Sequence, residues 1–401
     1  MKKWLAVILT ALLLGACFPA PGMIPAPADP PVTAEPPLPA PPKPEPVSAP
    51  PPEPAKATIL AAGDNLIHDI IWMTAERHAG KPGEYDFRPL YANVQKQIAA
   101  ADVASVNQET PLVASRPLSN FPLFNSPPAL AAQLKDIGFD AVTVANNHML
   151  DQGASGLQET LDALHAVPGL AVTGAFRTPQ ERDIIPVIEQ NGLKFAFLGY
   201  TQFTNGLVLP KGQEFRTILT ADREAVRRQL AAAQKLADVV VVNVHWGDEY
   251  SLSPNAYQKE LAQFFADCGA GVIFGHHPHV LQPAAELTAK DGRRVPVFYS
   301  LGNFLSAQHK SVNLVGIMAA VTFGKDFTTG NITYEKPVIT PVITHFNAGF
   351  GEFRLYPLAG YSDSLAAAHA LRQRFGEPFS VDWIKNYCVS AFGEDYDIEG
   401  V

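Results

Sequence analysis

Short apolar runs alternate with amphipathic stretches between residues 57 and 275 of the chain. The apolar runs have the length of buried strands, and the amphipathic stretches repeat their apolar positions at the spacing of a helix. We expect strands at residues 58–62, 103–106, 141–145, 184–188, 194–198, 239–244 and 271–274. We expect helices at residues 89–101, 128–137, 153–166, 221–236 and 254–268. This alternation predicts an α/β protein with a mainly parallel sheet.

The pattern changes near residue 295, where apolar runs follow one another without helical stretches between them. We expect strands at residues 295–300, 314–323 and 332–343, and we expect these later strands to complete a second sheet. Beyond residue 346 the sequence predicts one helix, at residues 362–375, and shows no motif typical of a site. We therefore divide the globular part into a domain at residues 57–346 and a C-terminal extension at residues 347–401.

The N-terminus has the features of an export signal. Two lysines precede an apolar segment, residues 4–13, that is too short to span a bilayer comfortably. The sequence Leu14-Gly15-Ala16-Cys17 follows and resembles the lipobox of bacterial lipoproteins, in which the cysteine is lipidated. We expect residues 1–17 to be a lipoprotein signal peptide and Cys17 to anchor the protein to a cell membrane, on its extracytoplasmic face. An ordinary signal peptide or a transmembrane anchor is the alternative.

Residues 18–56 are rich in proline, and 17 of the 36 prolines lie between residues 19 and 54. This composition favours polyproline II structure and predicts a linker that serves as a passive tether. The formal net charge of −9 becomes −11 without the leader, because the leader contains two lysines and no acid. That charge disfavours nucleic acid as a partner, although a metal site would still allow an anionic substrate. With only Cys268 and Cys388 beyond the lipobox, the protein must rely on an ordinary hydrophobic core, and we interpret Cys268 as a core residue.

Polar motifs follow several of the predicted strands at the point where each strand ends. Asp64 follows the first strand, and on this evidence alone it is better explained as a turn residue or helix cap. Asn107 and Glu109 follow the second strand and share one face of an extended segment. The third motif is Asn146-Asn147-His148, with Asp151 close behind. Its amides and imidazole would be costly to bury without partners, so they suit a metal ligand beside a general acid.

Two further motifs carry four histidines. His245 ends the run 239–244, and either Asp248 or Glu249 behind it could orient an imidazole. Residues 275–279 read Gly-His-His-Pro-His, so the rings of His277 and His279 can share one side of an extended segment. Taken alone, His245 could equally well be a structural residue or a metal ligand. However, neutral imidazole is the commonest side-chain ligand of transition metals.

The motifs together indicate a metal site, because ligands bind at the carboxyl ends of strands in α/β sheets, where side chains from separate strands converge. The motifs contain no cysteine, which argues against a structural zinc site of the thiolate type. Imidazole together with carboxylate suits Mn, Fe or Zn. We therefore expect one or two divalent transition metals.

The ordered motifs, which end with Ser300-Leu301-Gly302-Asn303-Phe304, resemble the CapA family of capsule poly-γ-glutamate synthesis proteins, related to the calcineurin-like metallophosphoesterases. The resemblance covers about residues 57–346. It implies an α/β/β/α double-sheet sandwich, with a metal centre between the sheets.

The resemblance also implies roles for individual residues. Asp64 and His279 would hold one metal, Asn147, His245 and His277 would hold the other, and Glu109 would bridge them. His148 would act as a general acid. The residues that would orient these groups or contact substrate are Asn107, Asn146, Asp151, Glu249 and Asn303.

Two departures from the broader metallophosphoesterase pattern leave open whether the site holds one metal or two. Where those enzymes have Asp-x-His, Leu66 stands two residues after Asp64, and the nearest histidine is His68. The second aspartate of their Gly-Asp-x-x-Asp motif is replaced by Asn107-x-Glu109.

We therefore expect a membrane-anchored, extracytoplasmic metal-dependent hydrolase that acts in the synthesis, export or anchoring of a capsule polymer. Its partners would be subunits of a capsule synthesis complex, and its substrate an anionic polymer or a phosphoester. Two alternatives are an extracellular phosphoesterase for small phosphoesters and a non-catalytic capsule-assembly subunit.

Overall fold

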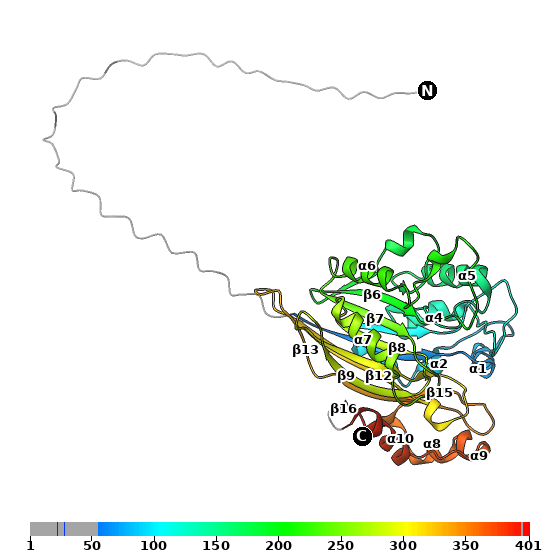
Figure 1. Ribbon diagram of the computed structural model, residues 1–401. Coiled ribbons are helices and arrows are strands. Elements are labelled where there is room, and N and C mark those ends of the chain that lie inside the picture. The colour runs from blue at the N-terminus through cyan, green and yellow to red at the C-terminus, as the bar shows by residue number, and fades with distance from the viewer. Residues whose placement is uncertain (1–21, 23–27, 29–54, 394–395) are drawn as a thin grey trace. The chain divides into compact units, whose positions relative to one another are not determined.

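The computed structural model describes residues 22, 28, 55–393 and 396–401. Cys17 and the proline-rich segment, apart from residues 22, 28, 55 and 56, lie outside this description. Residues 55–401 contain two mixed β-sheets (Figure 1), which are flanked by helices. In the part of the chain that is described, no helix is long and apolar enough to cross a membrane.

The larger sheet has ten strands in the order β15-β14-β12-β1-β2-β3-β4, with β11, β13 and β16 pairing to the side. Its strands are β1 (Ala55–Asn65), β2 (Val103–Gln108), β3 (Ala141–Thr143), β4 (Ala171–Thr173), β11 (Asn303–Leu305), β12 (Val315–Lys325), β13 (Ile332–Tyr334), β14 (Val338–His345), β15 (Arg354–Pro357) and β16 (Asp397–Ile398). Strands β1 to β4 run parallel, whereas β12 pairs antiparallel with β1.

The smaller sheet has six strands in the order β5-β6-β7-β8-β10-β9. Its strands are β5 (Val187–Gln190), β6 (Leu193–Thr201), β7 (Val239–His245), β8 (Val272–His276), β9 (Leu281–Thr288) and β10 (Arg294–Leu301). Strand β7 shows why this sheet is covered on both faces. Val239 and Val241 belong to the larger core, which includes the space between the sheets, and Val240 and Val242 belong to a second core.

Helices cover the outer faces of both sheets. Their bounds are α1 (Asp69–Ala79), α2 (Arg88–Tyr91), α3 (Gln95–Ala100), α4 (Ala129–Ile137), α5 (Gly153–His165), α6 (Arg223–Ala233), α7 (Ala256–Asp267), α8 (Asp363–Ala368), α9 (Ala370–Arg374) and α10 (Val381–Phe392). Leu230 of α6 and Phe265 of α7 pack in the second core, against the smaller sheet. The two sheets face each other, as the rings of Phe195 on β6 and Phe323 on β12 lie 6.1 Å apart. The predicted α/β/β/α double-sheet sandwich is confirmed.

The expectation that the later strands complete a second sheet is correct only for β10. Strands β12, β14 and β15 extend the sheet of β1, and β9 and β10 extend the sheet that contains β7 and β8. Both sheets are therefore mixed rather than mainly parallel. Apolar periodicity identifies a strand, but the partner of that strand depends on which neighbouring edge is free.

Three predicted elements are each broken in two. The helix expected at 89–101 is α2 and α3, separated by a turn. The strand expected at 332–343 is β13 and β14, with Pro337 between them, which lacks the N–H that a ladder requires. The helix expected at 362–375 is interrupted at His369, whose extended backbone (φ −63°, ψ 138°) separates α8 from α9.

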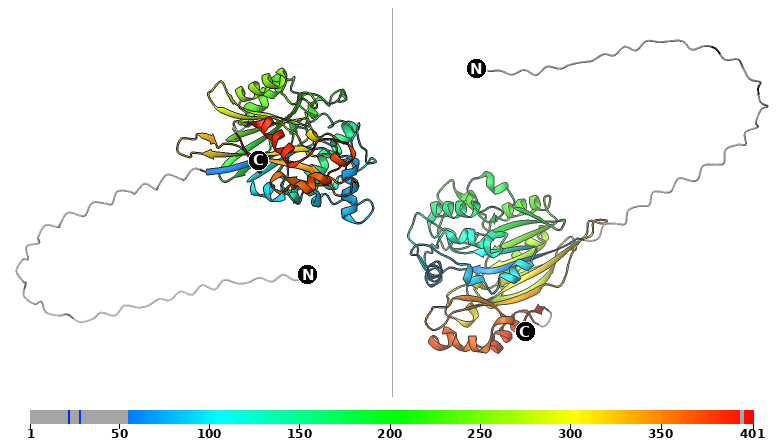
Figure 2. Two further views of the ribbon diagram at one scale, coloured as in Figure 1. Left: turned by 90° about the horizontal axis from the view of Figure 1, so that it is seen from below. Right: turned by 180° about the vertical axis from the view of Figure 1, so that it is seen from behind.

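The C-terminal extension is richer than the single helix that the sequence predicted. It contributes β15 and β16 to the larger sheet and contains α8, α9 and α10, which gather on one side of the unit (Figures 1 and 2). Helix α1 and strand β9 were also missed. Cys268 carries a free thiol and lies half-buried against the second core.

Candidate metal centre

The polar motifs meet at the carboxyl ends of strands from both sheets. Asp64 at the end of β1 lies in register with Asn107 of β2 and Asn303 of β11. His245 at the end of β7 lies in register with His276 of β8. A close backbone approach shapes this edge, because a Cβ atom on Gly63 would lie 2.0 Å from the carbonyl oxygen of Gly302. Only glycine before Asp64 allows that approach.

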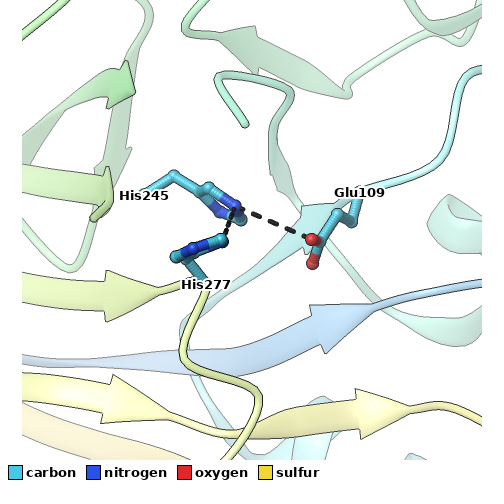
Figure 3. Close-up of side chains that lie close together, drawn as sticks. All are labelled: Glu109, His245 and His277. Carbon is cyan, nitrogen blue, oxygen red and sulfur yellow. Dashed lines mark hydrogen bonds and ion pairs between the residues drawn. The ribbon is translucent and has the colours of Figure 1, made fainter. Parts of the chain in front are cut away.

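Glu109, His245 and His277 form one candidate ligand group, and all three are buried (Figure 3). The Nε2 atom of His245 lies 3.1 Å from Nδ1 of His277 and 3.6 Å from Oε1 of Glu109. The Oδ1 atom of Asn147 lies 3.0 Å from the same Nε2 atom. Four side chains from four separate segments therefore direct potential ligand atoms at one point.

Asp64, Glu109 and His279 form a second candidate group, which shares Glu109 with the first. The Nδ1 atom of His279 lies 2.9 Å from Oδ1 of Asn303 and 3.2 Å from Oδ2 of Asp64. Both of those oxygens are acceptors, so Nδ1 carries the proton and the other ring nitrogen is available as a ligand. That nitrogen, Nε2, lies 3.6 Å from Oε1 of Glu109.

A third combination joins His277 and His279 to Glu249, which is exposed at the rim of the centre.

Asn107 and Asn146 form hydrogen bonds that hold the segments carrying the ligands. Asn107 Nδ2 donates to Oδ1 of Asp64 over 2.8 Å, and Asn146 Nδ2 donates to the carbonyl oxygen of Gln108 over 2.9 Å. The structure thus brings together every residue that the sequence predicted for the metal site.

The donor set fits a bound cation. Oε1 of Glu109 is buried without a hydrogen-bond partner, and a buried acceptor without a partner costs free energy. Around Nε2 of His245 lie another imidazole nitrogen, an amide oxygen and a carboxylate oxygen, which offer mainly lone pairs to one another. A divalent metal ion would satisfy these atoms together. Nitrogen and oxygen donors of this kind suit Mn, Fe or Zn.

The pKa values of the ionisable side chains in the centre are shifted because these groups are buried close to one another. Burial, and next the Asp64 carboxylate, raise the pKa of Glu109 well above its usual value. Burial alone would raise the pKa of Asp64, but hydrogen bonds from His276 and His279 hold it well below its usual value. Burial lowers the pKa of His277 to about 3, whereas the carboxylates of Glu109 and Asp64 outweigh burial and raise the pKa of His279 to about 9. A cation would compensate the two carboxylates and keep the imidazoles neutral.

His148 is held beside the ligand groups by Asp151. Its Nδ1 atom lies 2.7 Å from Oδ2 of Asp151, and the same carboxylate oxygen accepts the backbone N–H of Phe124 over 2.8 Å. The Phe124 ring packs edge-on against the imidazole, with the ring centroids 4.8 Å apart. This arrangement fixes the orientation of His148 and leaves Nε2 as the ring nitrogen available to a reacting group.

His276 and Phe124 belong to the site, although the sequence predicted a specific role for neither. His276 Nδ1 lies 3.0 Å from Oδ1 of Asp64, so this histidine orients the carboxylate. Its place in the Gly-His-His-Pro-His motif was the available signal. Phe124 gave none, because its role depends on a loop fold. His68 does not stand in for the missing Asp-x-His histidine, because it belongs to none of the candidate ligand groups in the described part of the chain. Its Nδ1 atom lies 3.2 Å from the backbone nitrogen of Ala307.

Comparison with known proteins places the chain in a family. Residues 58–308, more than half of the chain, match the family described as bacterial capsule synthesis protein PGA_cap. The chain belongs to this family.

Curated relatives of this PGA_cap protein include two bacterial proteins. The PGA biosynthesis protein CapA of Bacillus subtilis is 38% identical over 176 residues, which are 44% of this chain and 44% of that protein. The capsule biosynthesis protein CapA of Bacillus anthracis is 38% identical over 180 residues, which are 44% of this chain and 42% of that protein. The chain thus spans less than half the length of these relatives. Among solved structures, a phosphatase from Mycoplasma pneumoniae aligns with a TM-score of 0.43 and 14% identity, over 72% of this chain and 95% of that chain.

Proposed function

We propose that this PGA_cap protein is a metal-dependent hydrolase that acts on an acidic capsule polymer during its synthesis, export or anchoring. One observation carries the proposal. Ligand atoms of Glu109, Asn147, His245 and His277 converge on one buried point, and His148 is held beside them by a carboxylate. The similarity to the CapA proteins, which act in PGA and capsule biosynthesis, supports capsule synthesis as the process.

Each ligand group has a place in this function. Glu109, Asn147, His245 and His277 would hold one metal ion, and Asp64, Glu109 and His279 would hold a second, weaker one. Bound metal ions of this kind polarise the scissile group and lower the pKa of water. Asn107 and His276 both contact Oδ1 of Asp64 and orient its carboxylate.

His148 supplies the proton. The Asp151 carboxylate accepts from Nδ1 and fixes the orientation of the ring, so that Nε2 would face the leaving group and transfer a proton to it. The burial of Asp151 excludes water from this pair. A subunit that only binds other proteins would have no need of a carboxylate-supported imidazole at this position, which disfavours the non-catalytic alternative.

The proposal includes anchoring of the protein to the extracytoplasmic face of a cell membrane through a lipid on Cys17. The support is the sequence Leu14-Gly15-Ala16-Cys17 and the proline-rich segment behind it. The protein would then work beside membrane-bound subunits of a capsule synthesis complex.

Two assays test the function. Metal-loaded protein is offered the acidic polymer and a small phosphoester, and we expect faster turnover of the polymer. In a capsule-forming strain that lacks this protein, a His148→Ala variant should fail to restore the capsule. Full restoration by that variant would favour the non-catalytic subunit, and turnover of the phosphoester alone would favour the small-phosphoester hydrolase.

A further inference from the structure

A cavity of about 930 Å³ lies beside the metal centre. We call it the side cavity, and its lining includes His68, Phe121, Tyr250, Gln308, Lys310 and Asn313. Its volume lies in the upper part of the range for cavities that hold small-molecule ligands, about 300–1,000 Å³, and is far larger than a phosphate group requires. The metal centre therefore adjoins room for a much larger part of a substrate.

Three contacts connect the side cavity to the metal centre. Asn313 Nδ2 donates to the carbonyl oxygen of His279 over 2.9 Å, and Asn303 Nδ2 donates to Oε1 of Gln308 over 2.9 Å. The Tyr250 ring lies 6.3 Å from the His279 ring. Because His279 belongs to a ligand group, a molecule bound at the metals could extend directly into the side cavity.

The lining suits a chain that carries both negative charge and methylene groups. Lys310 provides an ammonium group, 69% exposed, and His68 and His309 provide imidazoles. Asp69 is the one acid among the described residues that line the cavity. Burial lowers the pKa of His68 to about 4 and also lowers the pKa of His309, so these imidazoles are neutral hydrogen-bonding groups and Lys310 is the cation of the described lining. With Asp69 the lining is close to neutral, whereas the chain as a whole has a net charge of −9. Phe121, which is 72% exposed, adds an apolar surface at the rim.

Lys310 is available to a ligand at little cost. Its Nζ atom lies 2.7 Å from Oε1 of Glu377, and an ion pair on the surface contributes little to stability. An ammonium group has three N–H donors, so Lys310 can bind an anionic group of a ligand while it remains paired with Glu377, or after it has separated from Glu377.

We infer that the side cavity is a binding subsite for the polymer segment next to the reacting one, with Lys310 pairing to a carboxylate of the polymer and Phe121 packing on its methylene groups. The inference rests on the proposed function and adds the residues that determine its specificity for a polymer.

The test measures binding, independently of turnover. The dissociation constant of a γ-linked glutamate hexamer is measured by calorimetry with full-length protein. We expect Lys310→Ala to raise the dissociation constant by roughly 3- to 10-fold. Glu377→Gln should lower it, because this change removes the anion that competes for Lys310. Phe121→Ala should raise it. Lys290→Ala is the matched control, since Lys290 is 83% exposed, pairs with Asp267 at 3.0 Å and does not line the side cavity.

The outcomes separate this inference from the proposed function. If the wild type binds the hexamer and the Lys310, Glu377 and Phe121 variants match the Lys290 control, the subsite is wrong and the hydrolase proposal stands. If the wild type does not bind the hexamer but turns over a small phosphoester, the polymer itself is wrong for both. A His245→Ala, His277→Ala variant should lose metal yet keep part of its affinity for the hexamer, because the side cavity is intact.

Discussion

The Nε2 atom of His245 lies 3.0 Å from the Oδ1 atom of Asn147, although 98 positions separate the two residues. Asn147 follows β3 of the larger sheet, and His245 ends β7 of the smaller one. The contact therefore exists only when the two sheets pack face to face, and a metal held by both residues would join the sheets. Binding to the folded state alone would also stabilise that packing.

Replacing both His245 and His277 by Ala should remove most of the bound metal, because the variant loses two of the four groups that converge on one point. Elemental analysis of purified wild-type protein should find about one to two transition-metal ions per chain. Thermal unfolding with and without chelator should show that the wild type loses stability with its metal and that the variant hardly changes. A His309→Ala variant, outside both ligand groups, is the control. Unchanged metal content in the double variant would exclude the assigned ligands.

Replacing His148 by Gln should lower activity by roughly 10²–10⁴-fold, the usual contribution of a positioned proton donor, and leave the metal content intact. Asn147→Ala should behave differently and weaken metal retention, because its amide oxygen faces His245. Activity and metal content are measured on the same preparations. A stable, metal-replete and fully active His148 variant would refute the proton-donor role.

Replacing Cys17 by Ser should release the protein from the membrane fraction or leave its leader uncleaved, because serine cannot accept the thioether-linked lipid. Cell fractionation and mass measurement check both results. Cys268→Ser, which leaves the lipobox intact, is the control. A variant with the size and membrane location of the wild type would contradict anchoring through Cys17.

The free energy of unfolding should fall as the pH drops from about 6.5 towards 4. Burial lowers the pKa of His345 and of His369 to about 4, whereas an unfolded histidine titrates near 6.5. In that interval the unfolded state binds more protons, so acid favours unfolding. Each histidine should contribute about 2 kcal/mol between pH 7.5 and 5.

Chemical denaturation of metal-free protein at the two pH values measures this effect. A His345→Phe variant should show a smaller loss of stability on acidification than the wild type, and the exposed His309→Phe should change the loss much less. An equal loss in the wild type and the His345 variant would show that His345 does not contribute.

The strand ends of the metal centre could be predicted from the sequence because both of their signals are local. The run of valines before His245 is apolar enough to predict a buried strand. The polar motif that follows would cost free energy if it were buried without partners, which predicts a site. The same reasoning located Asn147 and the His277–His279 pair. Asp64 and Glu109 gave only weak local signals, and their assignment as ligands came from the resemblance to the CapA family. Element boundaries were less certain, since α2 and α3, or β13 and β14, are separated by features that apolar periodicity does not reveal.

The tertiary structure alone decided which strands share a sheet, that His276 orients Asp64, that Phe124 supports His148, and that a side cavity lies next to His279. Each of these depends on contact between segments far apart in the sequence, such as the 212 positions between Asp64 and His276. Local pattern fixes how a segment folds and which of its faces is apolar. The partner of that face is selected by packing and hydrogen bonding across the whole domain, and no local signal carries that choice.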